Sequence, residues 1–341
     1  MNRRTAARSV LSVLLALDVL LRIATLRRSR GGATKDRRAF VADADDLPVV
    51  DAADDADAPG DGGHRGPAIP LPKPRETLHV ALDDGDGQPV VLVHGVASSH
   101  LAWVNVLPLL QGRRIIAVDL LGFGDSPAPL SATFTLEEHV AYLERALARL
   151  RLGDGFVLVG HSLGALIGAR YAARHPHRVG GLVLVSPPVY LPPEAVGNPL
   201  DRRAMELYGR VYTYIRREKA FTMRHAARLA KIWPTEGGFE VTEQNWRPFA
   251  LSLEHSIQTQ TAIADVAAAR QPVHLVYGTL DPVIVPGALH IIERMRHVTS
   301  HRIEGGDHAI RPRIAAAVAD AVAAVTDAAP APAGGLLRRR R

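Results

Sequence analysis

The chain has 341 residues, of which 47% are apolar and 22% charged, so it can bury a sizeable core and is not wholly disordered. It contains no cysteine, which excludes disulfide scaffolds, thiolate metal sites and cysteine nucleophiles. The net charge of +6 lies mostly near the ends: residues 1–38 carry ten basic and two acidic side chains, residues 39–72 eight aspartates and one arginine, and the last four residues are arginines. The remainder is close to neutral, so we expect no nucleic-acid partner.

Residues 1–26 are predicted to form an N-terminal apolar helix. The stretch 9–26 is the most apolar of its length in the chain, and Asp18 and Arg22 lie four residues apart, where they can pair on one helical face. Its basic flanks predict a transmembrane or interfacial helix that leaves the main domain at the cytoplasmic face of a membrane. One alternative is a helix docked on the protein's own surface, and another is a signal peptide. The corresponding locations are a soluble cytoplasmic protein and an exported protein.

Two further segments lack apolar periodicity. Residues 27–74 are rich in Asp, Ala, Gly and Pro and are predicted to be a disordered linker. Residues 328–341 are predicted to be a flexible basic tail. The folded domain is therefore expected over residues 75–327.

In this domain, apolar strands alternate with helical patterns. In chain order, strands are predicted over 77–82, 89–93, 114–118, 156–159, 182–185, 273–277 and 299–303, and helices near 100–110, 135–150, 163–174, 287–296 and 309–326. The continuous apolar run over 89–93 is typical of a strand that is buried on both faces. The alternation predicts an α/β fold with a mostly parallel central sheet and helices on both faces.

The interval of residues 190–271 is too long for a single crossover helix, so we expect an inserted helical lid. Residues 202–231 within it carry nine basic and two acidic side chains, interleaved with aromatic and apolar residues at helical spacing. A basic amphipathic helix of this kind is typical of contact with an anionic membrane surface. The alternative is a solvated lid that merely covers the pocket.

A candidate nucleophile, Ser162, follows the predicted strand 156–159 and precedes a helix. The sharp turn projects its hydroxyl, and Gly160 and Gly164 permit the close packing that such a turn requires. This turn lies at the carboxyl end of a strand, where ligands bind in open α/β sheets.

A second turn, His94-Gly95-Val96, follows the strand 89–93. Gly95 allows the backbone to direct the following N–H group toward the serine. We therefore expect the N–H groups of Val96 and Leu163 to form a two-donor oxyanion hole, with His94 and Gly95 supporting the loop.

A candidate base and acid follow the last two strands. His308 comes after the strand 299–303, and Asp281 comes after the strand 273–277. The chain order Ser162, Asp281, His308 is that of the nucleophile-elbow fold. Asp307 is the competing carboxylate, but as the sequence neighbour of His308 it is less able to reach Nδ1 of that imidazole.

Five segments carry a resemblance to a known family. They are HGVASSHLAW (94–103), DLLGFGDSP (119–127), GHSLG (160–164), GTLDPVIVP (278–286) and GGDH (305–308). Together, and in this order, they resemble the α/β-hydrolase superfamily in its single-domain serine esterase and lipase-like branch. The resemblance covers about residues 77–325. It implies that the loop 119–127 borders and shapes the active site.

The expected function is hydrolysis of a carboxylic ester, including hydrophobic or lipid-like esters, through an acyl-enzyme on Ser162. No metal or organic cofactor is expected. Ser162 stands where epoxide hydrolases and haloalkane dehalogenases of this fold carry an aspartate, and Val96 disfavours lipases with an extended HGGG motif. Carbon–carbon bond hydrolases and cofactor-free haloperoxidase- or perhydrolase-like enzymes share the order of the triad and remain alternatives, as does a ligand receptor that retained the fold.

Overall fold

The computed structural model describes residues 76–191, 199–224 and 239–328. The chain divides into two units, residues 1–73 and 74–341, and all described residues lie in the second. The strands are β1 (Val80–Asp84), β2 (Pro89–Val93), β3 (Arg114–Val118), β4 (Phe156–His161), β5 (Val179–Val185), β6 (Val273–Gly278) and β7 (Val298–Ile303). The helices that cover the sheet are α2 (Leu136–Arg149), α3 (Leu163–Arg174), α7 (Ala262–Ala268), α8 (Pro286–Glu293) and α9 (Pro312–Ala328).

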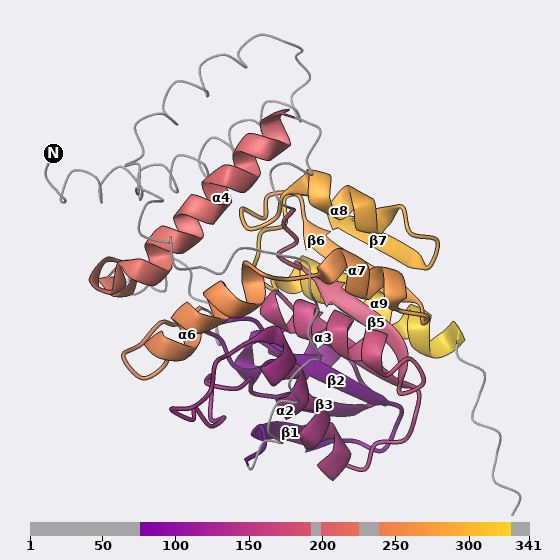
Figure 1. The fold of residues 1–341 in the computed structure, drawn as a ribbon. Helices are drawn as coiled ribbons and strands as arrows, with labels where there is room; N and C mark the ends of the chain where they lie inside the picture. The colour runs from indigo at the N-terminus through magenta and orange to yellow at the C-terminus, as the bar shows by residue number, and fades with distance from the viewer. Residues whose placement is uncertain (1–75, 192–198, 225–238, 329–341) are drawn as a thin grey trace, which may run out of the picture. The chain divides into compact units, whose positions relative to one another are not determined.

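The seven strands form one sheet in the order β1-β3-β2-β4-β5-β6-β7 (Figure 1). β1 pairs with β3 antiparallel, and every other neighbouring pair is parallel. Val93 at the end of β2 is level with Val118 of β3 and Gly160 of β4. The carboxyl ends of the parallel strands therefore share one edge of the sheet. This arrangement confirms the predicted α/β fold with a mostly parallel sheet.

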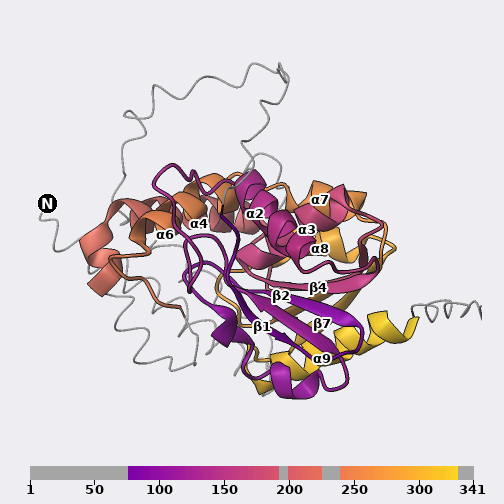
Figure 2. The ribbon, with the colours of Figure 1, turned by 90° about the horizontal axis from the view of Figure 1, so that it is seen from below.

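Helices cover both faces of the sheet, with α2, α3, α7 and α8 on one face and α9 on the other (Figure 2). Alternate residues of a strand serve the two faces: Leu158 of β4 belongs to the core under α3, whereas its neighbour Val157 belongs to the core under α9. Gly181 lets α9 approach β5 closely, because a Cβ there would lie 1.8 Å from Cγ1 of Val325. The strands are continuous apolar runs because each is buried on both sides.

The helix predicted near residues 100–110 is replaced by two short 3₁₀ helices, η3 (His100–Trp103) and η4 (Leu107–Leu109). The predicted stretch is thus helical, but as two 3₁₀ helices rather than one continuous helix, and the reason is local. Pro108 lies in the first turn of η4, and proline has no N–H group to continue an α-helical ladder from the preceding turn. Trp103 at the end of η3 is fully buried.

The interval predicted as a lid, residues 190–271, is helical where it is described. It contains α4 (Pro199–Arg217), α6 (Trp246–Ser252), the π-helix η6 (Leu253–Ile257) and α7. Because α7 packs against α3, it is the crossover helix between β5 and β6, whereas α4 packs against α6 and η6. The exposed side chains of α4 include Arg202, Arg203, Arg210 and Arg217. Its action as a lid and its contact with an anionic surface stay predictions.

The described part of the chain contains no helix that is long and apolar enough to cross a membrane. This finding contradicts the assignment of the protein as a membrane protein with a transmembrane helix, which is corrected accordingly. Residues 9–26, on which that assignment rested, lie outside the described residues, as does the linker 27–74. Of the predicted tail 328–341, only Ala328 is described, as the last residue of α9.

Candidate active site

Ser162 lies on a strained turn between β4 and α3. Its φ of 52° and ψ of −118° lie outside the common regions for a non-glycine residue. The turn is possible because its flanks lack side chains: a Cβ on Gly160 would lie 2.2 Å from the carbonyl oxygen of Gly164, and one on Gly164 would lie 2.2 Å from that of Val93. The Ser162 N–H donates to the carbonyl of Val185 at 2.9 Å, which ties the turn to β5.

The hydroxyl of Ser162 is not used to cap the helix that it begins. Ser162 is the N-cap residue of α3, yet within the described chain its side chain makes no capping hydrogen bond. Leu163, the first residue of α3, has no residue four positions earlier within the helix to accept its N–H. The helix N-terminus therefore presents both a hydroxyl and a backbone donor, together with a partial positive charge.

The turn after β2 lies directly against Ser162. A Cβ on Gly95 would lie 3.0 Å from Cβ of Ser162. His94 Nδ1–H donates to the Gly95 carbonyl at 2.7 Å, and Leu120 N–H donates to His94 Nε2 at 2.9 Å. Burial lowers the pKa of His94 to about 4, so the ring is neutral. Because Nε2 accepts from Leu120, the ring proton is on Nδ1. Because the Gly95 carbonyl and the Val96 N–H belong to one peptide plane, His94 also fixes the direction of that N–H.

The structure brings the predicted base and acid together. His308 Nδ1–H donates to Oδ2 of Asp281 at 2.8 Å, and Asp281 Oδ1 accepts from Val283 N–H at 2.9 Å. Their two loops lie in backbone contact, since a Cβ on Gly278 would lie 2.2 Å from the carbonyl oxygen of Gly306. Asp307, the competing carboxylate, instead accepts from Arg311 Nε at 2.8 Å.

The electrostatics of His308 favour its charged form. Burial acts to lower its pKa, but the charge and hydrogen bond of Asp281, with a contribution from Asp307, outweigh burial and leave the pKa raised above 6.5. The side chain of Asp281 is fully buried, whereas that of His308 is 25% exposed. With Nδ1 engaged by Asp281, the imidazole has Nε2 left to take up a proton.

His161 connects the serine turn to the His308 loop, a link that sequence reasoning missed. Its Nε2–H donates to the backbone carbonyl of His308 at 2.9 Å, and the two ring centroids lie 4.9 Å apart. Burial, followed by the charge of His308, lowers the pKa of His161 to about 3. The sequence feature that could have indicated this role is the position of His161 directly before Ser162 in the segment GHSLG.

Asp119 organises the loop 119–127, which the resemblance expected to shape the site. Its buried carboxylate accepts from His79 Nδ1 at 3.0 Å, from His100 N–H at 2.8 Å and from Asp125 N–H at 3.1 Å. A Cβ on Gly124 would lie 2.3 Å from Cγ of Asp119. The loop is therefore wrapped around one buried carboxylate.

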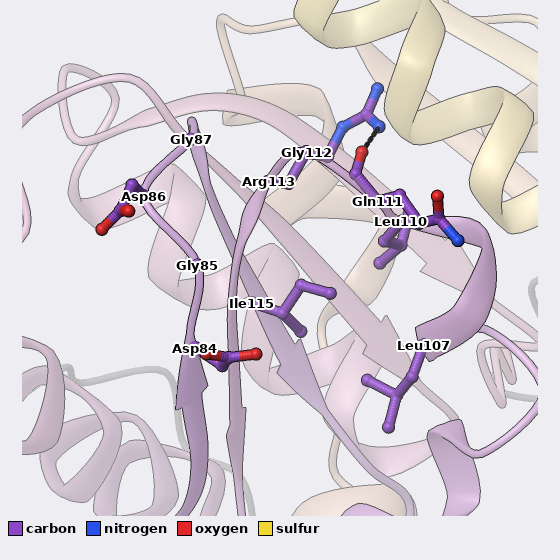
Figure 3. Close-up of a pocket in the computed structure, with 10 residues that line it drawn as sticks. All are labelled: Asp84, Gly85, Asp86, Gly87, Leu107, Leu110, Gln111, Gly112, Arg113 and Ile115. Carbon is purple, nitrogen blue, oxygen red and sulfur yellow. Dashed lines mark hydrogen bonds between the residues drawn. The ribbon is translucent and has the colours of Figure 1, made fainter.

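A hollow of about 470 Å³ lies between the β1–β2 turn and the start of β3 (Figure 3). It is lined by the β1–β2 turn, which includes Gly85 and Asp86, and by residues that precede or begin β3, including Arg113 and Ile115. These elements meet at the amino end of β3. Since the Ser162, Asp281 and His308 loops follow the carboxyl ends of their strands, this hollow is not part of the candidate active site.

Comparison with known proteins places this geometry in a family. A family model described as alpha/beta hydrolase fold matches residues 88–310, and the chain belongs to that family. It is 37% identical over 139 residues to a protein named probable lysophospholipase BODYGUARD 4 of Arabidopsis thaliana, a match that covers 37% of this chain and 33% of that one. It is 44% identical over 107 residues to a 2-hydroxy-6-oxo-2,4-heptadienoate hydrolase of Pseudomonas putida, covering 30% and 38%.

Solved structures agree on the fold. A haloalkane dehalogenase, DbeA from Bradyrhizobium elkani, superposes with a TM-score of 0.56 at 20% identity, over 74% of this chain and 99% of that one. The chain spans only about a third of the length of the curated relatives named above. Hydrolases of different chemistry thus share this fold, and the particular reaction rests on the residues of the site.

Proposed function

We propose that the protein is a serine hydrolase that cleaves carboxylic esters through an acyl-enzyme intermediate. The hydrogen bond between His308 Nδ1 and Asp281 Oδ2, at 2.8 Å, carries this proposal, because it gives the base an orienting partner. The strained turn at Ser162 and the adjacent turn at Gly95 support it. The nucleophile is Ser162, the base His308, the acid Asp281.

The reaction follows from these roles. Ser162 Oγ attacks the acyl carbonyl while His308 Nε2 takes its proton, and the N–H groups of Val96 and Leu163 stabilise the oxyanion. Collapse of the tetrahedral intermediate breaks the ester bond, and His308 returns the proton to the leaving alcohol. Water then attacks the acyl-enzyme with His308 as base, which releases the acid and restores Ser162. Asp281 holds the tautomer and stabilises the imidazolium.

The substrate is proposed to be a small ester with an apolar acyl group. The name of the Arabidopsis relative, a probable lysophospholipase, is compatible with an ester of this kind. Carbon–carbon bond hydrolysis is the second candidate, favoured by the match to the Pseudomonas hydrolase. A haloperoxidase- or perhydrolase-like activity and a receptor role without catalysis are weaker alternatives.

The test is covalent labelling with a fluorophosphonate probe, followed by peptide mapping. We expect the label on Ser162, and we expect Ser162→Ala and His308→Ala to lose it. A label on another serine, such as Ser98 or Ser126, would contradict the assignment. A panel of aryl esters of graded chain length, together with a vinylogous 1,5-diketone, then separates ester from carbon–carbon chemistry.

A further inference from the structure

Two tyrosine hydroxyls lie beside the loop that carries Asp281. Tyr190 follows β5 and Tyr212 belongs to α4, and their hydroxyl oxygens are 2.7 Å apart. Tyr190 also donates to the carbonyl of Val283 at 2.7 Å. Because a hydroxyl has a single proton, Tyr212 is the donor to Tyr190. Burial raises the pKa of Tyr212 to about 12, so this donor keeps its proton near neutrality.

The hydrogen bonds continue from Val283 to the catalytic pair. The Val283 N–H donates to Oδ1 of Asp281 at 2.9 Å, while Oδ2 of the same carboxylate accepts from His308 at 2.8 Å. Val283 is thus held by its carbonyl on one side and by its N–H on the other. The backbone of Tyr190 is itself fixed, since its carbonyl accepts from Gln260 Nε2 at 2.8 Å.

We infer that Tyr190 is a positioning residue for the acid. Its hydroxyl holds the turn 281–283 so that Val283 N–H and His308 Nδ1–H take opposite oxygens of one carboxylate, which fixes the rotation of Asp281. Through its hydrogen bond to Tyr190, Tyr212 connects α4 to this turn. The position of α4 therefore affects the geometry of Asp281 and His308. The inference rests on the proposed roles of Asp281 and His308.

The surroundings of His308 allow the effect of Tyr190 on Asp281 to be distinguished from effects on the other neighbours of His308. The charged groups that act on the pKa of His308 are Asp281 and Asp307, while His161, which stays neutral, contacts its ring. Asp307 is paired with Arg311, and His161 contacts the His308 backbone. Removing the Tyr190 hydroxyl leaves both of these in place. A changed titration of His308 in that variant would therefore report on Asp281.

The test is Tyr190→Phe in the full chain, read out by the pH dependence of fluorophosphonate labelling and by aryl-ester kinetics. Loss of one orienting hydrogen bond should lower the labelling rate and kcat roughly three- to tenfold with KM unchanged. The acid limb of the pH profile should move to lower pH, because a misoriented Asp281 raises the His308 pKa less. Tyr212→Phe should show a smaller change in the same direction. Tyr214→Phe, on the same helix but packed on Phe221, is the matched control.

A double-mutant cycle distinguishes positioning from general packing. In an Asp281→Asn background, Tyr190→Phe should cause almost no further loss, because its partner no longer acts. An additive loss, or a Tyr190→Phe profile identical to the wild type, would overturn the inference. Absence of labelling in the wild type, or labelling that survives Ser162→Ala, would instead refute the proposed function.

Discussion

His161 Nε2–H donates to the backbone carbonyl of His308 at 2.9 Å, across 147 residues of sequence. The residue next to the nucleophile therefore holds the loop of the base. The carbonyl can only accept, so Nε2 must carry the proton, and the lowered pKa of His161, about 3, keeps the ring neutral throughout the working range.

Replacing His161 by phenylalanine should separate this role from packing. Phenylalanine fills a similar volume beside Trp103 but cannot donate to His308, so we expect kcat to fall about tenfold with little change in KM. His177→Phe, at an exposed position, is the control and should keep full activity. A His161→Phe enzyme with wild-type kcat would show that this hydrogen bond does not orient the base.

Asp281→Asn should leave the fold intact and lower kcat by about 10⁴-fold, the size known for the same change in a serine protease. The raised pKa of His308 depends on Asp281, so in the wild type the acid limb of kcat/KM should lie above pH 6.5 and in the variant at lower pH. The base works only when neutral, which sets this sign. Asp307→Asn is the paired control: a larger loss there than in Asp281→Asn would reverse the assignment.

Three buried histidines should make the protein sensitive to acid. Burial lowers the pKa of His94 to about 4 and those of His139 and His161 to about 3, from 6.5. The unfolded chain therefore binds protons that the folded chain does not bind. Between about pH 6 and pH 4, the free energy of unfolding should fall by about 4 kcal/mol per pH unit for the three residues together.

The raised pKa of His308 opposes this trend, since its contribution to stability is complete below pH 6.5 and is lost as pH rises through the folded value. Of the acid dependence that His94, His139 and His161 cause in urea unfolding between pH 5 and 7, His139→Gln should remove about a third, whereas His177→Gln should retain the full slope. An unchanged slope in His139→Gln would mean that His139 is charged in the folded protein.

Two glycines of the site should respond differently to alanine. A Cβ on Gly164 would lie 2.2 Å from a backbone oxygen, whereas one on Gly95 would lie 3.0 Å from the Ser162 side chain and 3.2 Å from His161 Nδ1. Gly164→Ala should therefore abolish folded protein. Gly95→Ala should fold, with a melting temperature within a few degrees of the wild type, but lose at least tenfold in kcat. Gly209→Ala in α4, where a Cβ meets nothing within 4 Å, should keep the wild-type melting temperature and kcat. Equal behaviour of the three alanine variants would contradict this prediction.

The sequence was most informative where local pattern determines structure. Runs such as Val90 to Val93 predicted buried strands, and the short distance from each strand to its polar residue predicted the neighbourhood of Asp281 and His308. The helical stretch near residues 100–110 forms as two 3₁₀ helices rather than one continuous helix, because the effect of Pro108 outweighs apolar spacing. The contacts of Tyr190 with Val283 and of His161 with His308 join segments far apart in the chain, and no local pattern encodes which hydroxyl or imidazole meets which carbonyl.

Helix α9 is the last element of the described domain, and it packs across β4, β5, β6 and β7. During synthesis the Ser162 turn leaves the ribosome long before the strand that precedes His308 and before α9. Until α9 arrives, strands β4 to β7 lack the helix that packs on that face of them, and Gly181 lacks its close contact with Val325. The nascent chain should therefore be inert toward a fluorophosphonate and should depend on chaperones, and truncation before Pro312 should yield insoluble protein rather than a smaller enzyme.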